Sequence, residues 1–107
     1  MSDDPLDRLT AIIATRRGED PASSYVAALF AKGRPHLARK LGEEAVETIV
    51  AALGDDPAAL TAEAADLLFH LLVLLADAGL SLADIRAELA RREGVSGHDE
   101  KASRGAA

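Results

Sequence analysis

Apolar residues recur at helical spacing through most of the chain, in segments separated by Gly, Pro, Asp and Ser. The pair Asp4-Pro5 is a strong helix start, because Asp caps the helix and Pro fits the first turn, where no amide partner is lost. The apolar positions that follow share one face, and Gly18 ends the segment. A first helix is therefore expected from Pro5 to just before Gly18.

Four further helices are expected by the same reasoning, at about residues 24–32, 35–53, 57–78 and 81–92. Each is bounded by a capping Ser or Asp, a Pro or a terminating Gly. No segment alternates with the period of a strand, and the sequence after Gly94 has no periodicity, which taken alone indicates disorder. The pattern predicts one all-α domain over residues 1–107, with about five helices and disordered termini at about 1–4 and 105–107.

The fourth expected helix is apolar nearly all round, apart from a polar strip of Glu63, Asp66, His70 and Asp77. Helices of this kind are buried on several sides. A chain of 107 residues built from short helices has little protein to surround such a helix. We therefore expect a helical bundle with a central antiparallel hairpin, completed by homodimerisation; the alternative is an ordinary monomeric bundle.

Charge and composition narrow the class of protein. The net charge of −6 disfavours binding to long nucleic acid, which needs clustered Lys and Arg, and the lack of cysteine excludes disulfides and thiolate metal sites. The acidic N-terminus lacks the pattern of a secretory signal. The longest apolar run, Leu67 to Ala76, is well short of the ~20 residues of a membrane span. A cytoplasmic protein that binds neither nucleic acid nor membrane is expected.

Two acidic pairs lie on either side of the turn between the third and fourth helices. Glu47 and Glu63 are each six residues from that turn, or about 9 Å at ~1.5 Å per residue. Glu44 and Asp66 are each nine residues away, or about 13.5 Å. Because residues three or four apart share a helix face, one rotation of each helix brings all four carboxylates to a common point.

Four carboxylates this close repel one another, since each like-charged pair at ~4 Å costs about 4 kcal/mol at an effective dielectric of ~20. A cation is therefore expected among them. Oxygen ligands without Cys, and without a Glu-x-x-His motif, favour Mg²⁺, with Mn²⁺ as the second choice. The alternative is that these residues only keep a Leu- and Ala-rich protein soluble.

Four neighbours of the acidic residues are ambiguous from sequence. Glu43, one turn before Glu47, is either a further metal ligand or a solvated residue. Gly42 costs roughly 1 kcal/mol relative to Ala inside a helix, which indicates the close approach of a helix or a ligand. His70 is either a supporting or core histidine or a ligand, and Lys40 either pairs with a Glu or faces an anionic substrate.

The acidic motifs Glu-x-x-Glu and Glu-x-x-Asp resemble those of the all-α nucleoside triphosphate pyrophosphohydrolases of MazG type. Three longer stretches resemble the phosphoribosyl-ATP pyrophosphatase family more specifically: AKGRPHLARKLGEEAVETIVAA, EAADLLFHLLVLLADAGLSLADI and SGHDEKASR. The resemblance covers about residues 24–104. Phe69 and Arg39 depart from the family pattern, in which Tyr and Gln are common, but neither belongs to the acidic motifs.

This resemblance implies hydrolysis of 1-(5-phosphoribosyl)-ATP to 1-(5-phosphoribosyl)-AMP and pyrophosphate, the second step of histidine biosynthesis. It implies Mg²⁺ at Glu44, Glu47, Glu63 and Asp66. Either Glu44 or Glu47 then orients or deprotonates the attacking water.

The same resemblance implies that basic and hydroxyl side chains, which can donate hydrogen bonds to phosphate oxygens, bind the substrate. The expected substrate-binding residues are Lys32, Arg34, His36, Lys40, Lys101, Ser103 and Arg104. The alternatives are an ordinary basic loop and a solvated tail. Two rival functions also remain: a general pyrophosphohydrolase that clears non-standard nucleoside triphosphates, and a helical dimerisation module without catalysis.

Overall fold

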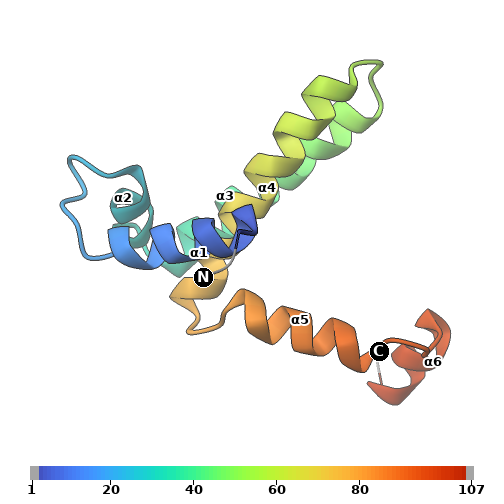
Figure 1. Cartoon of the computed structure of the whole chain (residues 1–107). Coiled ribbons are helices and arrows are strands. Elements are labelled where there is room, and N and C mark those ends of the chain that lie inside the picture. Colours follow the sequence, from blue (N-terminus) through green and yellow to red (C-terminus); the bar gives the residue numbers. More distant parts are fainter. Residues whose placement is uncertain (1–2, 106–107) are drawn as a thin grey trace.

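The computed structural model describes residues 3–105, which form six helices and no strand (Figure 1). The helices are α1 (Pro5–Arg16), α2 (Tyr25–Ala31), α3 (Arg34–Ala52), α4 (Pro57–Asp77), α5 (Leu82–Arg91) and α6 (Gly97–Ser103). The all-α prediction is confirmed, and α3 and α4 form the expected antiparallel hairpin.

Side-chain caps begin the helices where the sequence predicts them. The Asp4 carboxylate accepts a hydrogen bond from the Leu6 amide at 3.0 Å, and the Asp56 carboxylate accepts one from the Ala58 amide, also at 3.0 Å. The Ser81 amide donates to Asp84 Oδ2 at 2.8 Å, as in a capping box. These local bonds satisfy amides that have no partner inside the helix, which is why sequence alone locates the starts.

The count of about five helices is corrected by α6, in the tail that lacks periodicity. The hydroxyl of Ser96 accepts a hydrogen bond from the Asp99 amide at 3.1 Å. A helix this short needs a cap more than an apolar face, so periodicity could not reveal it. The expected disorder at Met1, Ser2, Ala106 and Ala107 lies outside the described residues.

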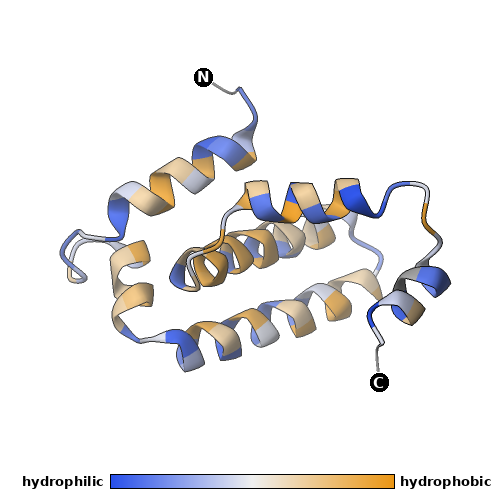
Figure 2. Ribbon diagram, turned by 90° about the horizontal axis from the view of Figure 1, so that it is seen from below, coloured by the Kyte–Doolittle hydropathy of each residue, from blue (hydrophilic) through white to orange (hydrophobic). Residues whose placement is uncertain are grey.

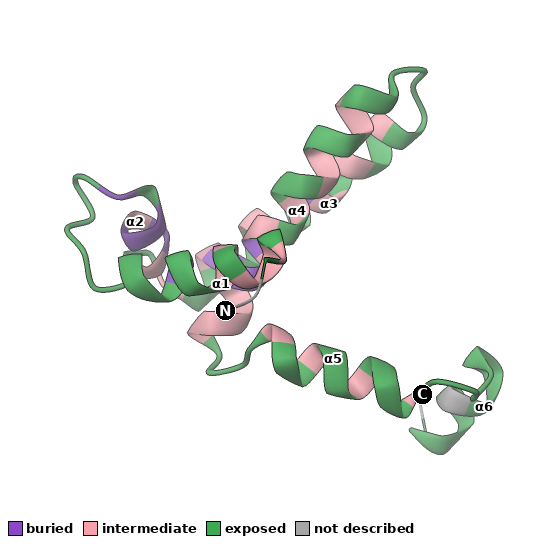
Figure 3. Cartoon of the chain, viewed as in Figure 1, coloured by how far each residue is buried: buried purple, intermediate pink, exposed green. Residues whose placement is uncertain are grey.

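The core lies where α1 and α2 pack against the hairpin near the start of α3 and the end of α4 (Figure 3). It consists of buried aliphatic side chains from these four helices: Ile13, Val26, Leu29, Leu37, Leu72 and Val73. The other half of the hairpin, toward its turn, extends beyond α1 and α2. Hydrophobic residues nevertheless continue along nearly the whole of α4 (Figure 2).

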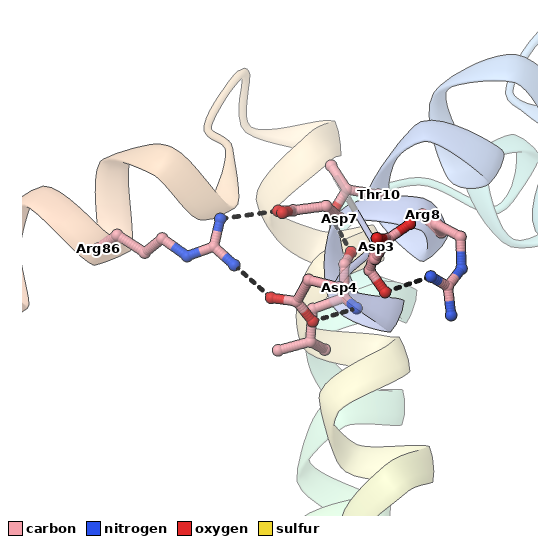
Figure 4. A network of polar contacts seen from close by, with 7 residues as sticks. Asp3, Asp4, Asp7, Arg8, Thr10 and Arg86 are labelled. Atoms are coloured by element: carbon pink, nitrogen blue, oxygen red, sulfur yellow. Dashed lines mark hydrogen bonds and ion pairs between the residues drawn. The ribbon is translucent and has the colours of Figure 1, made fainter. Parts of the chain in front are cut away.

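After α4 the chain turns, and α5 leads away from the hairpin with α6 at its far end (Figure 1). Leu82 packs against the core at the start of α5. One turn later Arg86 binds the carboxylates of Asp4 and Asp7 at 2.8 and 2.7 Å (Figure 4). These contacts attach α5 to the N-terminal helix.

Candidate active site

A threonine on α3 fixes how α3 and α4 face each other. Thr48 Oγ1 donates to the Glu44 carbonyl at 2.8 Å within its own helix and lies 3.2 Å from the Glu63 carbonyl of α4. Thr48 is therefore level with Glu63. Since the helices are antiparallel, Glu44, one turn before Thr48, is level with the part of α4 that carries Asp66.

The structure brings together three of the four acidic residues expected to hold a metal. Glu44, Glu63 and Asp66 each place one carboxylate oxygen within 4.8 Å of the others. Glu44 is buried, Glu63 is half-buried and Asp66 is exposed, so the group opens from the interior of the hairpin to solvent. We call these three residues the acidic group.

Two oxygens of the acidic group are buried without a hydrogen-bond donor, namely Oε2 of Glu44 and Oε2 of Glu63. Leaving a buried polar atom unsatisfied costs ~1–3 kcal/mol, and more when the group is charged. Lys40 Nζ lies 3.5 Å from Glu44 Oε1, so one lysine faces the group. A divalent cation held by carboxylate oxygens would satisfy the remaining atoms, and the all-oxygen donor set fits Mg²⁺ or Mn²⁺.

Glu47 and Glu43 lie beside the acidic group rather than in it. Both are exposed on α3, where they line an open groove of about 600 Å³ together with Arg39, Gly42 and Val46. A residue three positions along a helix is rotated by about 60° from the first, so Glu47 lies to one side of Glu44 on the helix surface. The acidic motifs thus supply the acidic group and, beside it, two exposed carboxylates, Glu43 and Glu47, which we call the rim.

Gly42 is not crowded within the chain. A Cβ atom added to it would meet no heavy atom within 4 Å. The close approach that the sequence indicates is therefore absent from the single subunit, and the open side of Gly42 faces the groove.

Lys40 remains protonated beside the acidic group. Burial lowers the pKa of Lys40. The electrostatic effects of Tyr25, Glu44 and Glu43, together with the hydrogen bond to Glu44, outweigh burial, so the pKa is raised overall. The ammonium group of Lys40 therefore pairs with Glu44, which is one of the two alternatives that the sequence left open. The other alternative, that Lys40 faces an anionic substrate, stays a prediction.

Among the basic residues at the start of α3, Arg34 has structural partners. Arg34 donates to Asp77 Oδ2 at 2.9 Å and to the Asp77 carbonyl at 3.0 Å, which joins the start of α3 to the end of α4. Arg17 lies 3.7 Å from the same carboxylate and stacks 4.5 Å above the ring of Phe30, a role that the sequence did not indicate. Lys32 is exposed, and His36 accepts a hydrogen bond from Arg39 at 3.1 Å.

The three residues of the tail expected to bind phosphate are Lys101, Ser103 and Arg104, in or just after α6. Figure 1 places α6 at the far end of α5, away from the hairpin that carries the acidic group. A single chain therefore does not bring them to that group.

His70 supports the acidic group from the next turn of α4. It is buried, and its Nδ1 lies 2.8 Å from the Asp66 carbonyl while its Nε2 lies 3.3 Å from the hydroxyl of Tyr25. His70 is not a member of the acidic group. Sequence reasoning had not singled out Tyr25, whose only signal was its place at the start of a helix.

The fold and the site define a class of protein: an all-α protein in which carboxylates of a helical hairpin form a candidate site for a hard cation. The profile of the family described as phosphoribosyl-ATP pyrophosphohydrolase matches residues 6–93. The chain belongs to this family, whose members are hydrolases of a pyrophosphate bond, and the resemblance seen in its sequence is confirmed.

Individual relatives agree with the family match over nearly the full chain. A protein of Rhizorhabdus wittichii named phosphoribosyl-ATP pyrophosphatase is 65% identical over 99 residues, which are 92% of this chain and 93% of the relative. Proteins with the same name from Erythrobacter litoralis and Zymomonas mobilis are 61% and 56% identical, covering 94% and 97% of this chain and 96% and 97% of those proteins.

Proposed function

We propose that this chain hydrolyses 1-(5-phosphoribosyl)-ATP to 1-(5-phosphoribosyl)-AMP and pyrophosphate. The observation that carries the proposal is the acidic group, whose buried unpartnered oxygens need a cation, in a chain of this family. Phosphoanhydride cleavage requires positive charge at the phosphate oxygens and a water positioned for attack. The hairpin offers carboxylates for both purposes.

Glu44, Glu63 and Asp66 would hold Mg²⁺, or Mn²⁺ in its place. When bound, such an ion neutralises charge on phosphate oxygens and lowers the pKa of a water molecule. Glu47, exposed beside the group, would either complete the ligand set or act with Glu44 as the carboxylate that orients and deprotonates the water. Glu43, on the same rim, is the further candidate ligand.

Basic side chains around the acidic group would bind the two phosphorylated ends of the substrate. Lys40 already faces the group. Lys32 lies just before α3, and His36 lies in the first turn of α3. Arg34 would hold the ends of α3 and α4 together while taking part in this patch. Lys101, Ser103 and Arg104 would act from the tail of a partner subunit, since within one chain they lie far from the group.

The active form would be a homodimer. Three apolar side chains of α3 and the residue that follows the helix, spaced as one helix stripe, are 59–84% exposed: Val46, Ile49, Val50 and Leu53. On the neighbouring helix Leu68 is 44% exposed. A second copy of the hairpin would cover this surface, which we call the hairpin stripe, and would complete the bundle.

By length and composition α4 is apolar enough to cross a membrane, and 17% of its most apolar window is buried within the chain. The apolar run from Leu67 to Ala76 is only part of this helix, which begins at Pro57. We propose that a partner hairpin, not lipid, covers α4, since Glu63 and Asp66 would be costly in a bilayer. A cytoplasmic enzyme that binds neither nucleic acid nor membrane fits the net charge of −6.

The function is tested by measuring pyrophosphate release from phosphoribosyl-ATP, dUTP and other nucleoside triphosphates with Mg²⁺. Phosphoribosyl-ATP is expected to be preferred, and Glu47→Gln and Asp66→Asn are expected to abolish turnover while circular dichroism remains helical. Preference for a simple triphosphate would favour the general pyrophosphohydrolase instead. Near-normal turnover in both variants would exclude the acidic residues as the catalytic site, and no turnover in the native chain would favour a dimerisation module.

A further inference from the structure

Tyr25 is an aromatic side chain held at the surface, beside the acidic group. It is the only tyrosine of a sequence without tryptophan, and it begins α2 with 58% of its surface exposed. The two phenylalanines of the chain are only partly exposed. A large exposed ring contributes little to folding, so its position invites a role in binding.

Two neighbours from α4 fix the orientation of the Tyr25 ring. The ring of Phe69 stacks against it, with centroids 6.1 Å apart and planes 19° apart. Its hydroxyl lies 3.3 Å from Nε2 of His70, whose ring is in turn packed edge-on to Phe69 at 4.9 Å. These neighbours order the ring before any ligand arrives, and the 58% exposure of the residue leaves it accessible to a ligand.

The same contacts place Tyr25 at the edge of the acidic group. His70, which meets the Tyr25 hydroxyl, also contacts the backbone carbonyl of Asp66 at 2.8 Å. Tyr25 is also among the groups that raise the pKa of Lys40, the lysine that lies 3.5 Å from Glu44. On α4, a single side chain, that of His70, thus lies between Tyr25 and a member of the acidic group.

We propose that Tyr25 binds the purine base of the substrate, which stacks on the ring face that Phe69 leaves open. The inference rests on the proposed function, in which the acidic group takes the phosphates. A ribose separates those phosphates from the base, so the base must lie a sugar's length beyond the acidic group. Base–aromatic stacking suits this position because it needs an ordered ring with one open face.

The single tyrosine makes the proposal directly measurable, because in a chain without tryptophan Tyr25 alone emits when light is absorbed in the tyrosine band, where phenylalanine does not absorb. With Mg²⁺ present, phosphoribosyl-AMP, which keeps the base, is expected to quench this emission with saturation. Pyrophosphate, which lacks a base, is expected to leave it unchanged. Free tyrosine amide mixed with the same ligands corrects for absorption of light by the nucleotide. Equal responses to both ligands, or no response to phosphoribosyl-AMP, would overturn the assignment.

Two substitutions distinguish the contribution of the Tyr25 ring to substrate binding from that of its hydroxyl. Tyr25→Phe keeps the ring and loses the contact with His70, whereas Tyr25→Leu removes the ring. The KM of Tyr25→Leu for phosphoribosyl-ATP is expected to exceed that of Tyr25→Phe by about tenfold, with little difference in kcat. Equal losses in the two variants, or losses confined to kcat, would assign the role to the hydroxyl and contradict stacking.

The outcomes also distinguish this inference from the proposed function. A chain that fails to hydrolyse phosphoribosyl-ATP but shows base-dependent quenching would overturn the function and keep Tyr25 as a base-binding residue. Normal turnover without base-dependent quenching would overturn the role of Tyr25 alone. The quenching experiment uses the native chain, so it decides the matter even if Tyr25→Leu does not fold.

Discussion

Glu44 is 6% exposed on α3, with one carboxylate oxygen lacking a hydrogen-bond donor. One of its oxygens lies within 4.8 Å of one oxygen of each of two further carboxylates, Glu63 and Asp66. At this distance and an effective dielectric of ~20, a like-charged pair costs about 3–4 kcal/mol, and the pairs that include the exposed Asp66 cost less because solvent screens them. Lys40 offsets part of this repulsion from one side. In the absence of a cation, the residue best suited to bind metal is therefore also a source of instability.

Glu44→Gln is expected to separate these two effects. Without divalent cations the variant should be at least as stable as the native chain, because one of the repelling charges is removed. Its affinity for Mg²⁺ should fall by about tenfold or more, because a carboxylate ligand is lost. Calorimetric titration measures the affinity, and thermal unfolding with and without Mg²⁺ measures the stability.

Glu19→Gln is the matched control for this substitution, since Glu19 is exposed in the loop after α1. It should leave both the affinity for Mg²⁺ and the shift in Tm on adding Mg²⁺ as they are in the native chain. If Glu44→Gln behaves like this control, the acidic group is not a metal site.

His36 offers a prediction about pH. Burial lowers the pKa of His36 below its ordinary 6.5, and the nearby charges of Lys32 and Arg39 lower it further. The folded chain therefore binds this proton less readily than the unfolded chain does. The stabilising contribution is complete above about pH 6.5 and is lost as pH falls through the lower, folded-state pKa.

A proton NMR titration of the His36 ring is expected to show a midpoint below 6.5. Lys32→Gln should move that midpoint upward, since it removes one of the positive charges that oppose protonation. A midpoint at or above 6.5 in the native chain would contradict the electrostatic description of this loop.

Helix starts were predictable from sequence because each depends on a few adjacent residues. Asp4 and Asp56 each accept a hydrogen bond from the amide two positions later, and Asp84 accepts one from the amide of Ser81, three positions earlier. The meeting of Glu44, Glu63 and Asp66 was also predictable, since helical rise and the length of the turn set the levels of α3 and α4.

Other features depend on tertiary contacts that no local pattern encodes. Glu47 lies on the rim rather than in the acidic group because the rotation of α3 is set by packing with α4. Arg34 meets Asp77 across 43 positions, and Tyr25 meets His70 across 45. Sequence spacing indicates which residues share one helix, but it does not indicate which residues of another helix they face.

α5 provides a prediction at the level of a whole element. Its Arg86 bridges Asp4 and Asp7 of the N-terminal segment, and both bonds raise the pKa of the guanidinium group. Arg86→Ala should therefore increase amide hydrogen exchange in α5 while leaving exchange in α3 and α4 unchanged. Arg91→Ala is the comparison, because Arg91 pairs with Glu88 inside α5. Equal effects of the two substitutions would mean that α5 is not attached through Arg86.

At the scale of the molecule, the chain leaves apolar surface where a small protein should bury it. The hairpin stripe lies on the part of the hairpin that α1 and α2 do not cover. Contiguous apolar surface of this kind marks an interaction site in soluble proteins. A second hairpin packed on the first would also close the groove beside Glu43 and Glu47.

Ile49→Lys is expected to prevent the proposed dimer, because it places a charge in the centre of the hairpin stripe, where Ile49 is 60% exposed. Ile12→Lys is the control, since Ile12 is 45% exposed on α1, outside the stripe. Sedimentation at micromolar concentration should show a dimer for the native chain and for Ile12→Lys, and a monomer for Ile49→Lys. A monomeric native chain, or equal disruption by both substitutions, would contradict this interface.

The monomeric variant would also show whether one subunit is sufficient for catalysis. Ile49 is not part of the acidic group, so Ile49→Lys should still bind Mg²⁺ through Glu44, Glu63 and Asp66. If Lys101 and Arg104 reach the site from the partner subunit, turnover of phosphoribosyl-ATP by this variant should fall at least tenfold although the metal remains bound. Full activity in the monomer would instead place the whole site within one chain, and would require the tail to fold back onto its own hairpin.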